Sequence, residues 1–208
     1  MPYYSEINTL FIHIPKTGGT SLEDYLRARY TQSLWGFAPA LYRVNTCFSA
    51  TLQHQLYRNI RRYQGLFGVD TEKCKIITIV RNPYERAVSD LFSLKRITKD
   101  SSKSAVYGEL KSYIARCPDN HGVPQYLFLI DSTGRISPEI KIFKTETLTD
   151  DLRAYGFSDF DVRANTGPGL DYYSYLNRAS IALINDRYLE DFQFFGYELI
   201  KLETASSS

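Results

Sequence analysis

The stretch "LFIHIPKTGGTSLEDYL" (residues 10–26) joins an apolar run to a helical pattern through a lysine, two glycines and several hydroxyl groups. An apolar run that stops at Pro15 is typical of a buried parallel strand. After the loop, Leu22, Tyr25 and Leu26 fall on one face of a helix. A loop that only connects a strand to a helix needs neither the lysine nor so many hydroxyl groups. The stretch therefore predicts both a local fold and a binding site.

A second strand–helix pair follows later in the chain. The β-branched run "KIITIV" (Lys75–Val80) ends at "RNP", and Tyr84, Val88 and Leu91 form one face of a helix that can begin at Pro83. Strands that alternate with helices predict an α/β fold of three layers with a mostly parallel central sheet. We expect the strand–loop–helix at residues 10–26 to be P-loop-like.

The remaining periodicity predicts further helices and a hairpin. Helices are expected over residues 51–63, 104–117, 147–155 and 174–194. Residues 126–130 and 140–144 are expected to be the two strands of a hairpin. The segment "RANTGPGLDYY" (residues 163–173) has the composition of a loop that could cover a site.

Composition limits the class of protein. A chain of 208 residues with 43% hydrophobic residues can bury one core, so we expect a single domain over residues 1–203 and a disordered tail over 204–208. The net charge of +2 produces no strong overall field, which disfavours nucleic acid as a partner. Any anion site must therefore come from a local arrangement of residues.

Compartment is suggested by the cysteines and by the apolar runs. Cys47, Cys74 and Cys117 are odd in number, far apart and without a CxxC pair, which favours free thiols in a reducing compartment over a disulfide framework or a zinc site. No run approaches the roughly 20 apolar residues of a membrane span, and no signal pattern opens the chain. We therefore expect a cytoplasmic protein without a membrane anchor.

The lysine–glycine loop has the features of an anion cradle. Ligands of parallel α/β sheets bind at the carboxyl ends of the strands, where helix N-termini offer unpaired N–H groups. Glycines allow the backbone to approach an anion closely, lysine adds a full charge and hydroxyls add donors. The expected contacts are Lys16, Thr17, Gly18, Gly19, Thr20 and Ser21.

This loop differs from a Walker motif. GxxxxGK[ST] places its lysine after the glycines, whereas Lys16 precedes them, and no magnesium-holding aspartate follows "KIITIV". A nucleotide triphosphatase is therefore disfavoured. The alternative is that the loop is an ordinary tight turn that binds no ligand.

A second anion site is predicted at the end of the second strand. Arg81 follows "KIITIV", and Ser89 lies eight residues later, about two helical turns away. An arginine fork and a hydroxyl on adjacent elements suit a separate phosphate. The alternative is that Arg81 pairs with Glu85 and that Ser89 has no binding role.

Both motifs resemble those of one family. "FIHIPKTGGTSLE" (residues 11–23) resembles the 5′-phosphosulfate loop of sulfotransferases, and "IVRNPYERAVSDLF" (residues 79–92) resembles their 3′-phosphate segment with its R-x7-S spacing. The carbohydrate subgroup of the heparan-sulfate 2-O type is the most similar. "PQYLFL", "IKIFKTETLTDDL" and "INDRYLEDFQFFGYEL" match the general pattern of its later segments, so the resemblance covers most of the chain.

The resemblance implies a donor and an acceptor. The family uses 3′-phosphoadenosine-5′-phosphosulfate (PAPS) and releases 3′,5′-ADP, and we expect no metal. Residues 16–21 would hold the 5′-phosphosulfate, with Lys16 beside the bridging oxygen, while Arg81 and Ser89 would hold the 3′-phosphate. The sulfuryl group would pass to a hydroxyl of a carbohydrate or glycan acceptor.

A catalytic base is also expected. His54 stands in an "LQH" context like that of a histidine in the similar subgroup, and its ordinary pKa near 6.5 suits proton transfer at neutral pH. His13 is expected to be buried within the first strand, and His121 to lie in an exposed loop. Glu23 and Glu146 are the alternative carboxylate bases.

The acceptor side is less marked in the sequence. The expected acceptor contacts are Arg58, which lies near His54 in the sequence, Gln125 and Asn165. Two rival functions remain open. A kinase-like nucleotide-binding enzyme would bind ATP–magnesium and ignore 3′,5′-ADP. A non-catalytic member of the family would bind the nucleotide or a partner protein without turnover.

Overall fold

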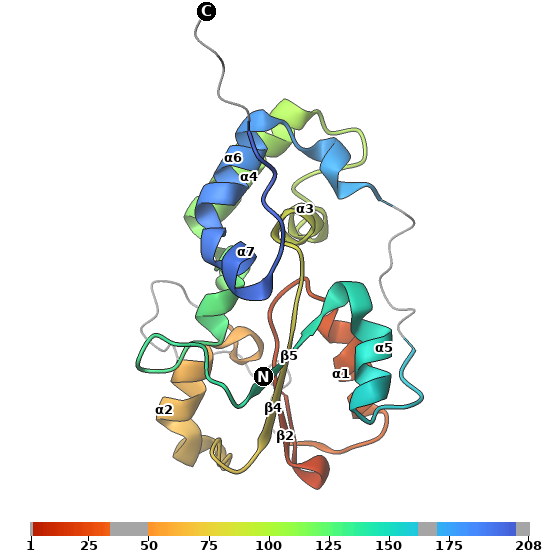
Figure 1. Ribbon diagram of the computed structural model, residues 1–208, viewed down its shortest axis with the longest axis vertical. Helices are drawn as coiled ribbons and strands as arrows, with labels where there is room; N and C mark the ends of the chain where they lie inside the picture. The colour runs from red at the N-terminus through yellow and green to blue at the C-terminus, as the bar shows by residue number, and fades with distance from the viewer. Residues whose placement is uncertain (1, 34–49, 162–169, 203–208) are drawn as a thin grey trace, which may run out of the picture.

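The computed structural model describes residues 2–33, 50–161 and 170–202 (Figure 1). Cys47, Asn165, most of the predicted loop over 163–173 and the tail over 204–208 lie outside the described residues. Cys74 and Cys117 are free thiols, as expected for those two positions. No described helix has the length and apolar character needed to cross a bilayer.

A mostly parallel sheet forms the centre, as predicted. β2 (Thr9–Ile12), β4 (Lys75–Val80) and β5 (Ile140–Lys144) run parallel, with Ile12 opposite Thr78 and Thr78 opposite Ile142. Two short antiparallel strands, β1 (Tyr3–Tyr4) and β3 (Gln32–Ser33), extend the β2 edge, so the order is β3-β1-β2-β4-β5.

Helices cover both faces of the sheet. α1 (Gly19–Arg27) and α5 (Leu148–Tyr155) pack on one face, and α2 (Tyr57–Phe67) packs on the other (Figure 1). Alternate strand residues divide between the two sides, because Phe11 packs with the α1 and α5 side chains while Leu10 packs with those of α2. The expectation of an α/β fold is confirmed.

A helical group lies beyond the carboxyl ends of the strands. It contains α3 (Pro83–Ser93), α4 (Lys103–Arg116), α6 (Arg178–Arg187) and α7 (Leu189–Phe195) (Figure 1). These helices share an apolar cluster that includes Val88, Leu110 and Ile184. Short 3₁₀ turns over Ser5–Ile7, Leu52–His54, Pro118–Asn120, Gln125–Phe128, Thr145–Thr147 and Tyr172–Tyr175 join the elements.

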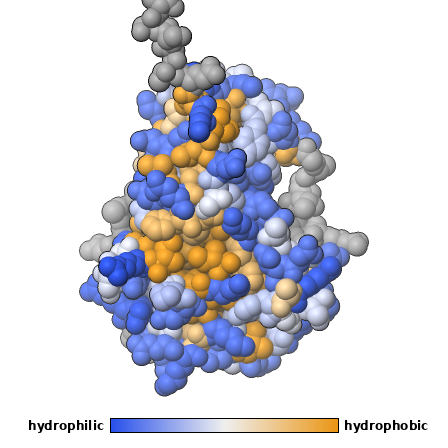
Figure 2. Space-filling model, viewed as in Figure 1, coloured by the Kyte–Doolittle hydropathy of each residue, from blue (hydrophilic) through white to orange (hydrophobic). Residues whose placement is uncertain are grey.

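One face of the molecule is partly apolar. Figure 2 shows apolar surface gathered in the region that α7 occupies in Figure 1. Phe194 of α7 is 57% exposed and stacks on Tyr126, with ring centroids 5.7 Å apart. Neither residue lines the cavity described below, whose walls are formed mostly by residues with polar or charged side chains.

The predicted hairpin is wrong. Residues 125–128 form a 3₁₀ turn, and only an isolated bridge joins Ile130 to Ile136 in the following segment. The reason is long-range: the N–H groups of Gln125 and Tyr126 both donate to the carboxylate of Asp191, each at 2.8 Å, and are lost to a strand ladder. β5 instead pairs in parallel with β4.

Two predicted helices differ from those in the structure. The helix expected over 51–63 is a 3₁₀ turn over Leu52–His54 followed by α2, because the amide of Gln55 donates to the carbonyls of Ala50 and Thr51 and closes the turn. The helix expected over 174–194 breaks at Tyr188, which leaves helical geometry at φ −117° and ψ 25° and lies buried between α6 and α7.

Candidate functional site

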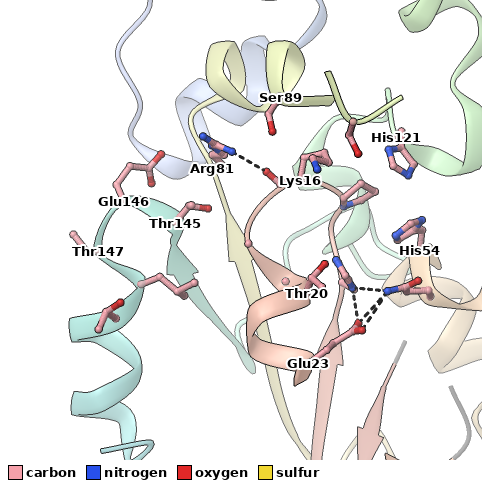
Figure 3. A pocket seen from close by; sticks show the side chains of 18 of the residues that line it. Lys16, Thr20, Glu23, His54, Arg81, Ser89, His121, Thr145, Glu146 and Thr147 are labelled. Atoms are coloured by element: carbon pink, nitrogen blue, oxygen red, sulfur yellow. Dashed lines mark hydrogen bonds and ion pairs between the residues drawn. The ribbon is translucent and has the colours of Figure 1, made fainter. Parts of the chain in front are cut away.

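A cavity of about 700 Å³ opens at the carboxyl ends of β2, β4 and β5 (Figure 3). Both predicted motifs contribute to it, together with segments that the sequence did not single out. The lining residues include Lys16, Gly18, Gly19, Thr20, Glu23, Gln53, His54, Arg81, Ser89, His121, Thr145, Glu146 and Tyr172. Charged and polar side chains thus converge where a parallel sheet places its ligands.

The lysine–glycine loop turns sharply into α1. Gly18 has φ 88° and caps the helix, and Lys16 also adopts a left-handed φ of 65°. Gly19 has no room for a side chain, since a Cβ there would lie 2.6 Å from Nε2 of His13. The two glycines are therefore required by backbone conformation and by close packing. α1 begins at the cavity with Gly19 and Thr20, while the N–H of Ser21 donates to the carbonyl of Gly18 at 3.1 Å.

Hydroxyl groups of this loop divide into two sets. Thr20 is exposed and lines the cavity, whereas the fully buried Thr17 donates its hydroxyl to the carbonyl of Ile14 at 2.9 Å. Ser21 is buried and is absent from the cavity lining. Of the six predicted contacts in this loop, Thr17 and Ser21 are thus placed to shape the turn, and the others face the cavity.

The ends of the three parallel strands are tied together. Thr145, directly after β5, donates its hydroxyl to the carbonyl of Thr17 at 2.7 Å and to that of Val80 at 3.1 Å. Arg81 reaches the same loop from β4, with its guanidinium 3.5 Å from the carbonyl oxygen of Lys16. The two predicted anion motifs are therefore neighbours (Figure 3).

The two cations of the motifs differ in their surroundings. Among the described residues, none forms a hydrogen bond or ion pair with the Lys16 ammonium, which is half-buried at the cavity wall. Arg81 pairs with Glu85 at 3.0 Å and lies over the ring of Tyr172, 4.9 Å from its centroid. The pairing of Arg81 with Glu85, the alternative to a phosphate role, is thus present in this ligand-free structure.

Arg86 is a site residue that sequence reasoning missed. It is 2% exposed and donates to the carbonyls of Pro15 at 2.9 Å, Val123 at 3.0 Å and His121 at 2.7 Å. One buried guanidinium therefore links the lysine–glycine loop to the segment that carries His121. Its only local signal was a charge inside a helix that is buried on most sides.

All three histidines lie in a row along one wall. The centroid of the His54 ring is 5.3 Å from that of His13 and 5.0 Å from that of His121. Each Nδ1 contacts a carboxylate: His13 contacts Glu23 at 2.5 Å, His54 contacts Asp119 at 2.7 Å, and His121 contacts Asp90 at 2.7 Å. His13 is buried as predicted, although it directly follows β2 and does not lie within it. His121 is half-buried at the cavity and not in an exposed loop, because Arg86 and Asp90 hold it inward.

His54 has the environment of a neutral imidazole. Burial lowers the pKa of His54 below its usual value, and the neighbouring His13 and His121 act in the same direction, although the hydrogen bond to Asp119 opposes them. A histidine that is uncharged at neutral pH can accept a proton. His54 lies on a 3₁₀ turn and not on the helix expected for it.

The alternative bases are both engaged. Burial alone would raise the pKa of Glu23, but the hydrogen bonds from His13 and Gln53 and the charge interaction with His13 together outweigh it, and the pKa is lowered. Glu146 is exposed and accepts from the N–H of Asn82 at 2.8 Å and from the hydroxyl of Tyr197 at 2.9 Å. Both carboxylates line the cavity.

A group of potential metal ligands stands at the cavity wall. His54, Asp119 and His121 each place one potential ligand atom within 4.8 Å of the others. Nδ1 of His54 and a carboxylate oxygen of Asp119 are 2.7 Å apart, a hydrogen-bond distance, whereas two ligand atoms of a tetrahedral zinc ion stand about 3.3 Å apart. These two atoms could not both bind such an ion without moving apart.

The predicted acceptor contacts lie in different places. Arg58 is exposed on α2 and does not line the cavity. Gln125 is fully buried, and its amide accepts from the N–H of Arg81 at 2.9 Å and donates to the carbonyl of Arg81 at 2.8 Å. Asn165 lies outside the described residues. Gln125 is thus placed to orient Arg81.

Comparison with known proteins gives no assignment. No protein-family model matches the chain, and neither a curated protein nor a solved structure matches it significantly. The class of the protein must therefore be argued from its own motifs and geometry.

Proposed function

We propose that this protein is a PAPS-dependent sulfotransferase, which moves a sulfuryl group from PAPS to a hydroxyl of a carbohydrate or glycan acceptor. The proposal combines the resemblance of two sequence motifs with their location around one cavity. The reaction would release 3′,5′-ADP from the donor, and its proposed mechanism requires no metal ion.

One observation carries the proposal: the guanidinium of Arg81 lies 3.5 Å from the carbonyl of Lys16. The two motifs follow adjacent parallel strands, so their loops meet at one edge of the sheet. Their contact suits a cosubstrate with two anionic groups, one held by the helix start and Lys16 and the other by Arg81 and Ser89.

The mechanism follows from the positions of the charges. Sulfuryl transfer resembles phosphoryl transfer, in which the attacking and leaving oxygens stand in line and charge develops on the leaving oxygen. The Lys16 ammonium and the N–H groups at the start of α1 stabilise that charge. Because the sulfuryl group carries less charge than a γ-phosphoryl group, fixed donors suffice without a metal.

His54 acts as the base. Its imidazole is neutral at physiological pH because burial lowers its pKa, and it faces the same cavity as Lys16. Nε2 takes the proton of the acceptor hydroxyl as the sulfur–oxygen bond forms. The polar wall around it, with Gln53 and Glu23, suits an acceptor rich in hydroxyl groups.

A ligand screen tests the proposal against the kinase alternative. We expect 3′,5′-ADP to raise the melting temperature, and ATP–magnesium to have a much smaller effect. Replacement of Arg81 by Ala should weaken binding of 3′,5′-ADP far more than that of 5′-AMP, since only the former carries a 3′-phosphate. Equal losses for both nucleotides would remove the 3′-phosphate assignment.

Turnover is tested with labelled PAPS and a panel of sugars and glycans. Transfer to any hydroxyl acceptor supports the proposal. Normal binding of 3′,5′-ADP without transfer across the panel would favour a non-catalytic nucleotide-binding protein.

A further inference from the structure

We infer that Asp119 is the positioning residue of His54, which holds the imidazole in the tautomer that presents a lone pair on Nε2 to the cavity. The orientation of His54 follows from the structure alone. Its kinetic consequence rests on the proposed function, in which His54 accepts the proton of the acceptor hydroxyl. No motif in the sequence pointed to Asp119.

The contacts of Asp119 determine where the proton of His54 lies. Its carboxylate lies 2.7 Å from Nδ1 of His54 and also accepts from the N–H and the hydroxyl of Thr51. Burial alone would raise the pKa of Asp119, but hydrogen bonds from His54 and Thr51 hold it below its usual value. An ionised carboxylate can only accept, so Nδ1 carries the hydrogen and Nε2 of the neutral ring carries the lone pair.

The backbone around Asp119 is held in an unusual conformation. Cys117, Asp119 and Asn120 all have left-handed φ angles, of 41°, 48° and 63°, although none is glycine. Such residues persist where the surrounding structure enforces them, and they concentrate at functional sites. Here one of the contacts that hold the backbone involves His54 itself, because the amide of Asn120 donates to the His54 carbonyl at 2.9 Å.

Contacts from other elements hold the same segment from behind. Arg86 donates to the carbonyl of His121, and Tyr188 donates to that of Gly122 at 3.3 Å. The segment over residues 117–122 is therefore clamped between the helical group and the 3₁₀ turn of His54. A left-handed turn at these positions points the Asp119 carboxylate at Nδ1 and not at solvent.

The other two histidine–carboxylate pairs have different surroundings. His13 has its Nε2 packed against the backbone of Gly19. The partner of His121, Asp90, is fully buried and also accepts from the hydroxyl of Tyr113 at 2.5 Å, so this carboxylate belongs to the helical core. In the pair of His54 and Asp119, the ring lines the cavity, and the carboxylate contacts His54 and Thr51, which belong to the same turn.

The first test reads the tautomer directly. Because the chain has three histidines, their side-chain nitrogens can be resolved by long-range ¹H–¹⁵N NMR of the labelled full chain. We expect His54 to carry its proton on Nδ1 in the wild type at pH 7.5. In Asp119→Asn, the new amide can donate to Nδ1, so we expect the proton to move to Nε2. A wild-type His54 protonated on Nε2 would overturn the inference, whether or not the variant folds.

The second test uses kinetics and pH. Asp119→Asn should lower kcat by about 10² to 10⁴, as loss of a tautomer-fixing carboxylate does elsewhere, while KM for PAPS and affinity for 3′,5′-ADP stay within about twofold. The titratable neighbours of His54 are Asp119, His13 and His121, and of these only Asp119 raises its pKa. The acid limb of the kcat profile should therefore move to lower pH in the variant, an effect that a purely structural role would not produce.

Thr51→Val is the matched control. It removes the 3.1 Å hydrogen bond from the threonine hydroxyl to the same carboxylate but keeps the contact between Asp119 and His54. We expect a lower melting temperature, an unchanged tautomer and a loss in kcat of less than about tenfold. A loss equal to that of Asp119→Asn would contradict a role through the tautomer.

The outcomes separate the inference from the proposed function. If the tautomer responds to Asp119→Asn but the wild type transfers no sulfuryl group, the role of Asp119 stands and the proposed reaction is rejected. If the wild type transfers but the His54 tautomer is the same in both proteins, the reaction stands and the inference is rejected.

Discussion

Replacement of Gln125 by Met tests whether this buried amide orients Arg81 or contacts the acceptor. Gln125 exchanges two hydrogen bonds with the backbone of Arg81, at 2.9 and 2.8 Å. Each buried group left unpaired costs about 1–3 kcal/mol. Because Arg81 is only half-buried, we expect the lower part of this range, a loss of about 2–4 kcal/mol for the two groups. For a chain of this size, that loss lowers the melting temperature by about 4–16 °C.

The functional effect should fall on the 3′-phosphate. A charge-assisted contact of Arg81 is worth about 1.5–3 kcal/mol, so its displacement weakens 3′,5′-ADP by about 10- to 100-fold. Affinity for 5′-AMP should change little. Calorimetric titration of both nucleotides, at a temperature where the variant is folded, measures the difference.

A matched glutamine serves as the control. The amide oxygen of Gln64 accepts from the N–H and the hydroxyl of Thr71, away from the cavity. Gln64→Leu should lower stability without changing affinity for 3′,5′-ADP. If Gln125→Met leaves 3′,5′-ADP binding intact but raises KM for the acceptor, the orienting role is refuted and the acceptor contact expected from the sequence is correct.

Three further changes probe the charges. Lys16→Ala should lower kcat by about 10²–10³ because a donor to the leaving oxygen is lost; turnover at the wild-type rate would contradict that role. Glu85→Gln should tighten 3′,5′-ADP binding by a few fold, since it frees the Arg81 guanidinium from its 3.0 Å ion pair; titration showing weaker binding would mean that Glu85 positions Arg81. Burial raises the pKa of Asp191 to about 6, so the folded state binds this proton more tightly than the unfolded chain, whose pKa is about 4. The stabilisation that comes from this proton is fully present below about pH 4 and is lost as the pH rises through 6, which lowers the free energy of unfolding by about 3 kcal/mol in all. The melting temperature should therefore fall more steeply between pH 5 and 7.5 for the wild type than for Asp191→Asn.

The local pattern of hydrophobic residues was sufficient to predict several of the elements that position the cavity. β4 and β5 occupy the predicted strand ranges, and α4 lies within one residue of its predicted limits. β4 is buried along almost its whole length, and α4 buries Val106, Leu110 and Tyr113 on one face; both patterns can be recognised within a short window of the sequence. The neighbouring positions of Lys16 and Arg81 followed from the rule that parallel strands end at one edge of the sheet.

Two of the failures share a different cause. The turn at Gln125 depends on Asp191, 66 residues away, and the inward position of His121 depends on Arg86 and Asp90. In each case a charged side chain binds backbone or ring atoms of a distant segment, which hydrophobic periodicity does not encode. Such contacts override a local preference once the chain has folded.

The buried guanidinium of Arg86 has a consequence for how this protein could be altered. Its planar guanidinium binds the carbonyls of both Pro15 and His121, so one rigid cation sets the spacing between the lysine–glycine loop and the segment that carries His121. Side chains that line the cavity can then be exchanged without changing the spacing between these two segments. Lysine at this position would retain the charge but would lack the planar group that binds several carbonyls at a fixed spacing.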